Sequence, residues 1–299
     1  MASLYTDADK NIRKTWFLML TFFFVVVGLG WAFSYIFESP LILIVAVVFS
    51  VVMNIGSFWY SDKLALATSG AKSADEKEFL EVHRILENLS IATGIPKPRL
   101  YIINDPAPNA FATGRDYKHA AIAVTTGLLS MMERSELEGV IAHELSHIKN
   151  RDTLVMTVVV VLLGFVTLLS DFFLRSMLWG GMSGNGGGER DGRMQMIMIV
   201  AGFVLAIFAP IVAQLIQFAI SRKREFLADA SGALMTRYPE GLASALEKIG
   251  AYKAPMKRAN HATAHLFIGN PFGAKAMKGM NRLFSTHPPV EERIAALLK

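Results

Sequence analysis

The sequence predicts a mainly α-helical membrane protein, in which four transmembrane helices accompany an α+β domain with a small sheet. Hydrophobic residues make up 53% of the 299 residues, and the mean hydropathy of +0.38 is high for a soluble protein. Four long stretches carry no charged residue, and the segments between them are charged and contain short apolar runs. Part of the chain is therefore expected in lipid and part in water.

The four uncharged stretches are the expected membrane spans. A helix needs about 20 apolar residues to cross the hydrocarbon core of a bilayer. The third stretch is short for this purpose, and Gln214 and Gln217 make the fourth partly polar, so buried core helices are the alternative for this second pair. The four stretches cover residues 15–37, 39–61, 153–170 and 194–221.

Two hairpins of spans divide the chain into four parts. An even number of spans places both termini and both soluble parts on one side of the membrane. The positive-inside rule makes that side cytoplasmic, because basic residues flank the spans there. These residues are Lys10, Arg13, Lys14, Lys149, Arg151, Arg222, Lys223 and Arg224. The parts are an N-terminal transmembrane hairpin (1–61), a first soluble part (62–152), a second transmembrane hairpin (153–221) and a second soluble part (222–299).

Composition excludes several kinds of site. The chain has no cysteine, so a metal site has to use His, Asp, Glu or water, and disulfides and cysteine nucleophiles are excluded. The net charge is +5, but no basic stretch is interleaved with aromatic residues, which argues against nucleic acid as a partner. Basic segments beside membrane spans fit an anionic lipid bilayer as the partner instead. The sequence leaves the oligomeric state open.

The soluble parts predict helices around a small sheet. Short apolar runs bounded by turn residues indicate strands, and apolar residues at helical spacing indicate amphipathic helices. The second soluble part is expected to be mostly helical. The expected strands cover 99–103, 109–114 and 120–124, and the expected helices of the first soluble part up to residue 133 cover 74–90 and 125–133.

The sequence HELSH matches the pattern H-E-x-x-H on a predicted helix. Ser135 and Glu138 form a capping-box pattern that starts this helix. Residues four apart on a helix differ by about 40° around its axis, so His143 and His147 can bind one metal ion. Zinc suits such a site because it binds histidine nitrogen and keeps a position for water. Glu144 lies beside them and can take the proton from that water. Two incidental histidines on a solvated face are the alternative.

A third ligand has to come from another part of the chain. Asn150 and Thr153 stand where the longer pattern H-E-x-x-H-x-x-G-x-x-H has glycine and histidine. A glutamate on a later helix is the other common solution, and Glu225 supplies it. Asp229 is four residues further on the same helix face, so we expect it to orient a ligand histidine. A solvated acidic pair that balances neighbouring arginines is the alternative.

Together these motifs resemble the HtpX family of membrane zinc metallopeptidases, relatives of the type 1 CAAX prenyl protease within the glutamate-zincins. The resemblance covers essentially the whole chain, and no motif position departs from the family pattern. It rests on both hairpins, on NAFA at 109–112, on HELSH followed by Asn150 and Asp152, on SRKREFLAD at 221–229, and on STHPP at 285–289 followed by Glu292 and Arg293.

The resemblance implies a zincin-like catalytic domain and a zinc-dependent endopeptidase. The enzyme would lie in the bacterial cytoplasmic membrane and cleave misfolded or damaged membrane proteins, or unfolded polypeptides, at the cytoplasmic face. It implies one zinc ion per chain, bound by His143, His147 and Glu225. Glu144 would be the general base.

Further roles are implied by the same resemblance. His287 either stabilises the oxyanion or fixes the C-terminal fold, and these two roles stay open. Arg222 would be a second electrostatic aid in the transition state. A strand edge would bind the substrate backbone by β-pairing. This edge consists of Asn109, Ala110, Phe111 and Ala112.

Other functions fit the sequence less well. A binding or chaperone-like membrane protein with a structural metal has no need of Glu144. A metal transporter needs ionisable ligands inside its spans, and the stretches hold none beyond their edges. A prenyl-peptide protease has more spans, which enclose a large chamber. A second histidine pair, His261 and His265, ranks below HELSH because Ala262 stands in place of the glutamate.

Overall fold

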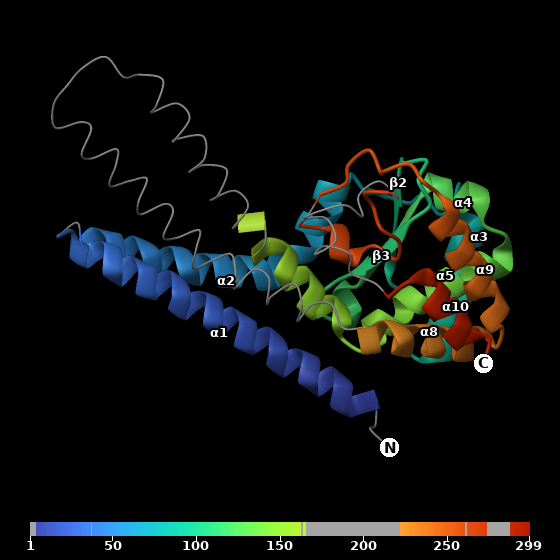
Figure 1. Cartoon of the computed structure of the whole chain (residues 1–299), viewed down its shortest axis with the longest axis horizontal. Helices are drawn as coiled ribbons and strands as arrows, with labels where there is room; N and C mark the ends of the chain where they lie inside the picture. The colour runs from blue at the N-terminus through green and yellow to red at the C-terminus, as the bar shows by residue number, and fades with distance from the viewer. Residues whose placement is uncertain (1–3, 37, 163, 166–221, 261, 274–287) are drawn as a thin grey trace, which may run out of the picture.

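The computed structural model describes residues 4–36, 38–162, 164–165, 222–260, 262–273 and 288–299. Two long helices lie side by side and lead into a domain of shorter helices around one sheet (Figure 1). The chain is thus mostly helical with a small mixed sheet, as the sequence predicts.

The first hairpin consists of α1 (Leu4–Ile36) and α2 (Pro40–Ser69). Pro40 opens α2 at a first-turn position, where its missing N–H costs no hydrogen bond. The apolar windows Asp9–Tyr35 and Pro40–Ser69 have mean hydropathies of 2.1 and 2.5, yet only 22% and 11% of them are buried in the protein. Long helices with so much exposed apolar surface fit lipid rather than water, so both are suited to cross a membrane.

The second predicted hairpin is described only in part. Asp152–Leu162 is an apolar helix up to the point where the described residues are interrupted, and residues 164–165 are again helical. Most of the remainder of the third stretch, and the whole of 194–221, lie outside the described residues. Among the described residues two helices are long enough to span, so four spans are not confirmed. Because α2 continues to Ser69, the expected boundary after residue 61 falls inside a helix.

The small sheet has four strands in the order β1-β2-β4-β3. β2 and β4 pair in parallel, whereas β1 and β3 run antiparallel to their neighbours. The three predicted strands are confirmed within one or two residues. The sequence pattern did not indicate β1, which is too short to show an alternation. The strands are β1 (Lys72–Ser73), β2 (Arg99–Ile103), β3 (Ala110–Thr113) and β4 (Ala121–Thr125).

Short helices complete the domain, and those of the C-terminal part pack on one another and on the helix that carries HELSH. The helix expected over 74–90 begins later than predicted, because the Asp75 carboxylate accepts hydrogen bonds from the amides of Lys77 and Glu78 and holds this segment in a turn. The helices are α3 (Leu80–Thr93), α4 (Thr126–Met131), α5 (Arg134–Lys149), α8 (Arg222–Thr236), α9 (Pro239–Ala251) and α10 (Val290–Leu297), with 3₁₀ turns at Tyr117–His119 and Ala264–Leu266.

The start of α5 differs from the prediction. Glu133 is the N-cap residue, and Glu136 completes the capping box by accepting a hydrogen bond from the Glu133 amide at 2.8 Å. The predicted pair, Ser135 and Glu138, was wrong by two residues. Glu136 is the better partner because Lys248 and Ser244 of α9 also hold its carboxylate, at 2.7 and 2.6 Å.

α5 is the central helix of the domain, and two glycines let its neighbours approach closely. A Cβ atom on Gly139 would lie 2.8 Å from the backbone nitrogen of Leu242 in α9. A Cβ atom on Gly232 in α8 would lie 3.0 Å from the backbone nitrogen of His143. The apolar face of α5 packs under the sheet and its other face packs on α8, which brings two distant parts of the sequence to the HELSH motif.

Candidate metal centre

α5 presents His143 and His147 on one buried face. Both side chains are nearly inaccessible to solvent. Their Nε2 atoms lie 3.2 Å apart, and the two rings are almost perpendicular. The four-residue spacing therefore places both imidazoles around one point, as predicted.

Glu225 of α8 completes this group. Its carboxylate oxygens lie 3.7 Å from Nε2 of His143 and 3.6 Å from Nε2 of His147. One ligand atom from each of the three residues lies within 4.8 Å of the others. Tetrahedral ligands at the usual zinc–nitrogen and zinc–oxygen distances are separated by about 3.3 Å. The two Nε2 atoms match this spacing, and the Glu225 carboxylate lies somewhat further out. The three residues could therefore hold one metal ion.

The other nitrogen of each imidazole faces a carboxylate. Nδ1 of His143 lies 2.9 Å from Asp229, and Nδ1 of His147 lies 3.0 Å from Asp152. A neutral imidazole that donates through Nδ1 keeps its lone pair on Nε2, so both carboxylates aim Nε2 at the centre. Asp229 has the position that the sequence predicts. Asp152 was not assigned a role, although it lies only five residues after His147.

Arg293 of α10 is a further buried residue that the sequence left without a role. Its guanidinium donates two hydrogen bonds to Asp229, at 2.6 and 2.8 Å, and it is 1% exposed. Burial raises the pKa of Asp229, but the hydrogen bonds from Arg293 and His143 outweigh this effect and lower the pKa to about 2. Asp229 thus stays ionised and able to accept the His143 proton.

The pKa values of the two histidines shift in opposite directions because their charged neighbours differ. Burial lowers the pKa of His143 to about 4, although Asp229 opposes the shift. Burial also lowers the pKa of His147, but Glu225, Asp152 and Glu144 outweigh it and raise the pKa to about 9. Anionic surroundings that stabilise an imidazolium also stabilise a cation, so the donor set and its charge both fit a metal ion.

Glu144 lies beside the triangle without belonging to it. The side chain is 2% exposed. Burial and the nearby charge of Glu225 raise its pKa to about 7, although His147 and the Ala112 amide oppose this shift. A carboxyl group with a pKa near neutrality can both accept and return a proton at physiological pH.

The sequence profile of Peptidase family M48 matches residues 76–299, well over half of the chain. The chain belongs to peptidase family M48. Proteins named "Protease HtpX homolog" are similar over nearly their whole length: from Caldanaerobacter subterraneus (49% identical; 99% of this chain and 97% of the relative), Pyrococcus furiosus (46%; 96% and 94%) and Streptococcus gordonii (39%; 99% and 99%). The family and these relatives make the chain a membrane metalloprotease, and the HtpX resemblance is confirmed.

A solved structure shows the same fold. The crystal structure of Ste24p from S. mikatae aligns with a TM-score of 0.51 at 16% identity, covering 96% of this chain and 66% of that longer chain. An identity this low supports the fold alone. The M48 chain described here therefore shares its architecture with a larger protein.

The NAFA segment of this M48 chain forms the edge strand β3, but part of the edge is already bonded. The Ala110 oxygen accepts a hydrogen bond from the Ile268 amide at 2.9 Å. The Asn109 side chain exchanges two hydrogen bonds with the backbone of Gly269, both at 3.0 Å. Phe111 is fully buried and packs against Phe267, with ring centroids 5.0 Å apart.

The remaining predicted residues lie in different surroundings. Arg222 is exposed at the first position of α8, one turn before Glu225. His287 and His261 lie outside the described residues. His265 is buried and bonds the oxygen of Met156, in the helix Asp152–Leu162, at 2.9 Å, so it has a structural partner rather than a surface position.

Proposed function

We propose that this chain is a zinc-dependent endopeptidase that cleaves misfolded or damaged membrane proteins and unfolded polypeptides at the cytoplasmic face of the membrane. The triangle of His143, His147 and Glu225, with Glu144 beside it, is the observation that supports this proposal most strongly. One zinc ion per chain, bound by these three residues, would activate a water molecule and polarise the scissile carbonyl.

The protein's own residues would move the proton. Glu144 would take it from the attacking water and return it to the leaving amine, which a pKa near 7 favours in both directions. Asp229 and Asp152 would keep the protons of the two histidines on Nδ1, which leaves both Nε2 atoms free to bind the metal. Roles for His287 at the oxyanion and for Arg222 as an electrostatic aid are part of the proposal.

Substrate backbone would pair with the edge of β3. The Ala110 oxygen is bonded to Ile268, so a substrate strand has to displace this bond or pair further along, at Ala112. The Ala112 amide points to the same side of the strand and reaches Glu144. We therefore propose that Ala112 contacts the substrate beside the scissile bond, while Asn109 and Phe111 hold the strand in place.

Cleavage should be measured on the purified full chain in a lipid nanodisc, with casein and a misfolded membrane protein as substrates. We expect Glu144→Gln to retain zinc by metal analysis and to lose about 10²–10⁴-fold in turnover, because only the base is removed. We expect Glu225→Ala to lose both zinc and turnover. Glu138→Gln on the solvent side of α5 is the matched control. Equal turnover in wild type and Glu144→Gln would contradict the mechanism.

The membrane orientation has a separate test. The chain has no cysteine, so one cysteine introduced at the exposed residue Lys299 would be labelled uniquely. We expect a membrane-impermeant maleimide to label this position in inverted vesicles and not in intact cells. Labelling in intact cells would contradict the cytoplasmic assignment.

A further inference from the structure

The first membrane helix carries a buried polar residue that contacts the neighbours of the candidate metal ligands. Asn11 of α1 is 3% exposed. Its Nδ2 atom donates to the Asp152 carboxylate at 2.8 Å and to the Asn150 oxygen at 2.9 Å. These contacts join residues about 140 positions apart in the sequence. Asn11 thus links the membrane hairpin to the C-terminal end of α5.

The two carboxylate oxygens of Asp152 contact different partners, one in α1 and the other the candidate ligand His147. Oδ1 faces Asn11, and Oδ2 lies 3.0 Å from Nδ1 of His147. A carboxylate that is held at one oxygen cannot rotate freely about its χ2 bond, so the direction of the other oxygen is also set. The donor on Asn11, which makes the shortest contact to Oδ1, therefore helps to set where the Nδ1 partner of His147 lies.

Asn11 also contacts the neighbour of another proposed ligand. Its Oδ1 atom accepts a hydrogen bond from Arg224 at 3.3 Å, and Arg224 lies 3.4 Å from Asp152. Arg224 directly precedes Glu225 in α8. Both polar atoms of the Asn11 amide thus have partners: Nδ2 donates toward the end of α5, and Oδ1 accepts from α8.

Apolar packing holds α1 at this place. Leu18, Met19 and Phe22 of α1 pack against Leu154, Val158 and Leu162 of the helix that Asp152 begins. The Asn11 amide is therefore carried on a helix that is fixed against the domain, which is what a positioning contact requires.

We infer that Asn11 is a positioning residue for the metal centre: it fixes the Asp152 carboxylate that orients His147, and so couples the first membrane helix to metal binding and catalysis. The inference rests on the proposed zinc peptidase function. Asn11 touches neither metal nor substrate, so its loss should lower zinc affinity and kcat and leave KM unchanged. Removing a partner that orients a ligand costs about 10–100-fold in metal affinity. We expect about tenfold for Asn11, because it acts on the ligand only through Asp152.

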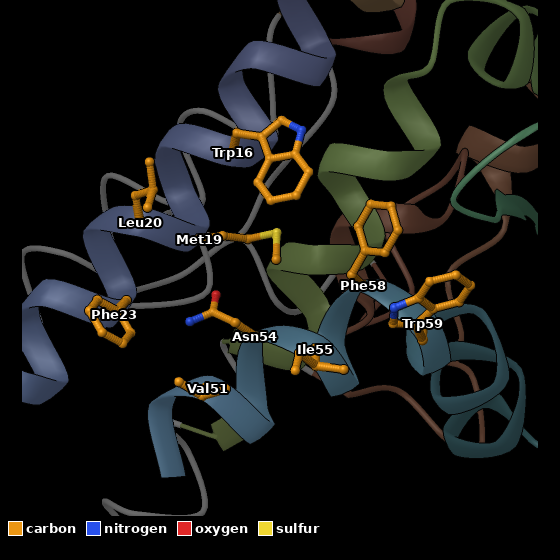
Figure 2. A pocket seen from close by; sticks show the side chains of 9 residues that line it. All are labelled: Trp16, Met19, Leu20, Phe23, Val51, Asn54, Ile55, Phe58 and Trp59. Carbon is orange, nitrogen blue, oxygen red and sulfur yellow. The ribbon is translucent and has the colours of Figure 1, made fainter. Parts of the chain in front are cut away.

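The matched control is an asparagine in the other membrane helix. Asn54 of α2 lines an apolar cleft of about 270 Å³ between α1 and α2, together with Met19 and Phe58 (Figure 2). Its Nδ2 atom donates within its own helix, to the Ser50 oxygen at 2.9 Å. Asn54→Ala therefore removes the same side chain from the same hairpin without touching the metal centre.

The test compares Asn11→Ala, Asn11→Asp and Asn54→Ala in the full chain in nanodiscs. Zinc affinity is measured by chelator competition, the zinc-dependent rise in thermal midpoint by calorimetry, and kcat and KM with a peptide substrate. We expect both Asn11 variants to bind zinc about tenfold more weakly. Alanine is the better helix former, so a loss in Asn11→Ala cannot come from weakening α1 itself. Asn11→Asp keeps the shape but removes the donor and places a second carboxylate against Asp152.

Three results would overturn the inference. One is a zinc affinity in Asn11→Ala equal to that in Asn54→Ala. Another is a lower midpoint of the zinc-free protein with an unchanged zinc-dependent rise, which would make Asn11 an anchor only. The third is full additivity between Asn11→Ala and Asp152→Asn, since residues that act through one another are not additive. If wild type itself neither binds zinc nor cleaves, the proposed function fails as well, whereas the first three results leave it intact.

Discussion

The buried pair of Asp229 and Arg293 allows a sharp stability prediction. Both side chains are at most 2% exposed, and two hydrogen bonds of 2.6 and 2.8 Å join them. Asp229→Asn keeps the shape but removes the charge, so the Arg293 guanidinium would remain buried beside a neutral amide. Removing one partner of a buried ion pair costs about 3–5 kcal/mol.

The exposed pair of Arg134 and Glu138 supplies the comparison. Its N–O distance is 3.1 Å, but its side chains are 59% and 35% exposed. Solvent screens such a pair, so Glu138→Gln should cost less than about 1 kcal/mol. The two substitutions change the same kind of contact, an arginine with a carboxylate, and differ in burial.

Thermal unfolding in detergent with a chelator present measures this cost without a contribution from metal. We expect Asp229→Asn to lower the midpoint by roughly 10 °C and Glu138→Gln by only a few degrees. The double variant Asp229→Asn/Arg293→Met should recover part of the loss, because no charge then remains buried alone. Equal midpoints for Asp229→Asn and Glu138→Gln, or a double variant as unstable as the summed single changes, would refute this reasoning.

Three other perturbations test the packing around α5, metal binding and the charge of Glu136. Gly232→Ala should push α8 from the backbone of His143 and weaken zinc binding, which chelator competition measures. Chelation should lower the thermal midpoint of wild type, because a ligand that binds only the folded state stabilises it. Burial raises the pKa of Glu136, but hydrogen bonds from Lys248, Ser244 and the Glu133 amide outweigh this effect and lower the pKa. Glu136→Gln should therefore destabilise the protein most above pH 4.5 and progressively less as the pH falls below 4.5. Thermal midpoints of both proteins, measured across this pH range, test the expectation.

Each of these has a control in the chain. Gly56→Ala adds a Cβ in α2 where nothing lies within 4 Å, so it should leave zinc binding unchanged, and an equal loss in both glycine variants would contradict the packing argument. Equal thermal midpoints of wild type with and without a chelator would mean that no metal binds the folded state. A constant gap between wild type and Glu136→Gln at every pH would show that the charge of Glu136 does not stabilise the fold.

Local spacing in the sequence was sufficient to predict several elements of the fold. The three predicted strands, the first hairpin and the helix that carries HELSH all follow from periodicity and turn residues, which act over a few positions. The capping box was misplaced by two residues because the decisive contacts of Glu136 come from α9. A local pattern offers two equivalent glutamates, and only packing between helices chooses one.

The sequence by itself determined the chemistry of the candidate centre: no cysteine, two histidines one turn apart, and a glutamate on a later helix. The tertiary structure alone decided what surrounds it. Asp152 beside His147, Arg293 beside Asp229, and Asn11 beside Asp152 are contacts between side chains whose distance along the chain carries no periodic signal. Such contacts depend on how α1, α5, α8 and α10 pack, and packing is a property of the whole fold rather than of any one segment.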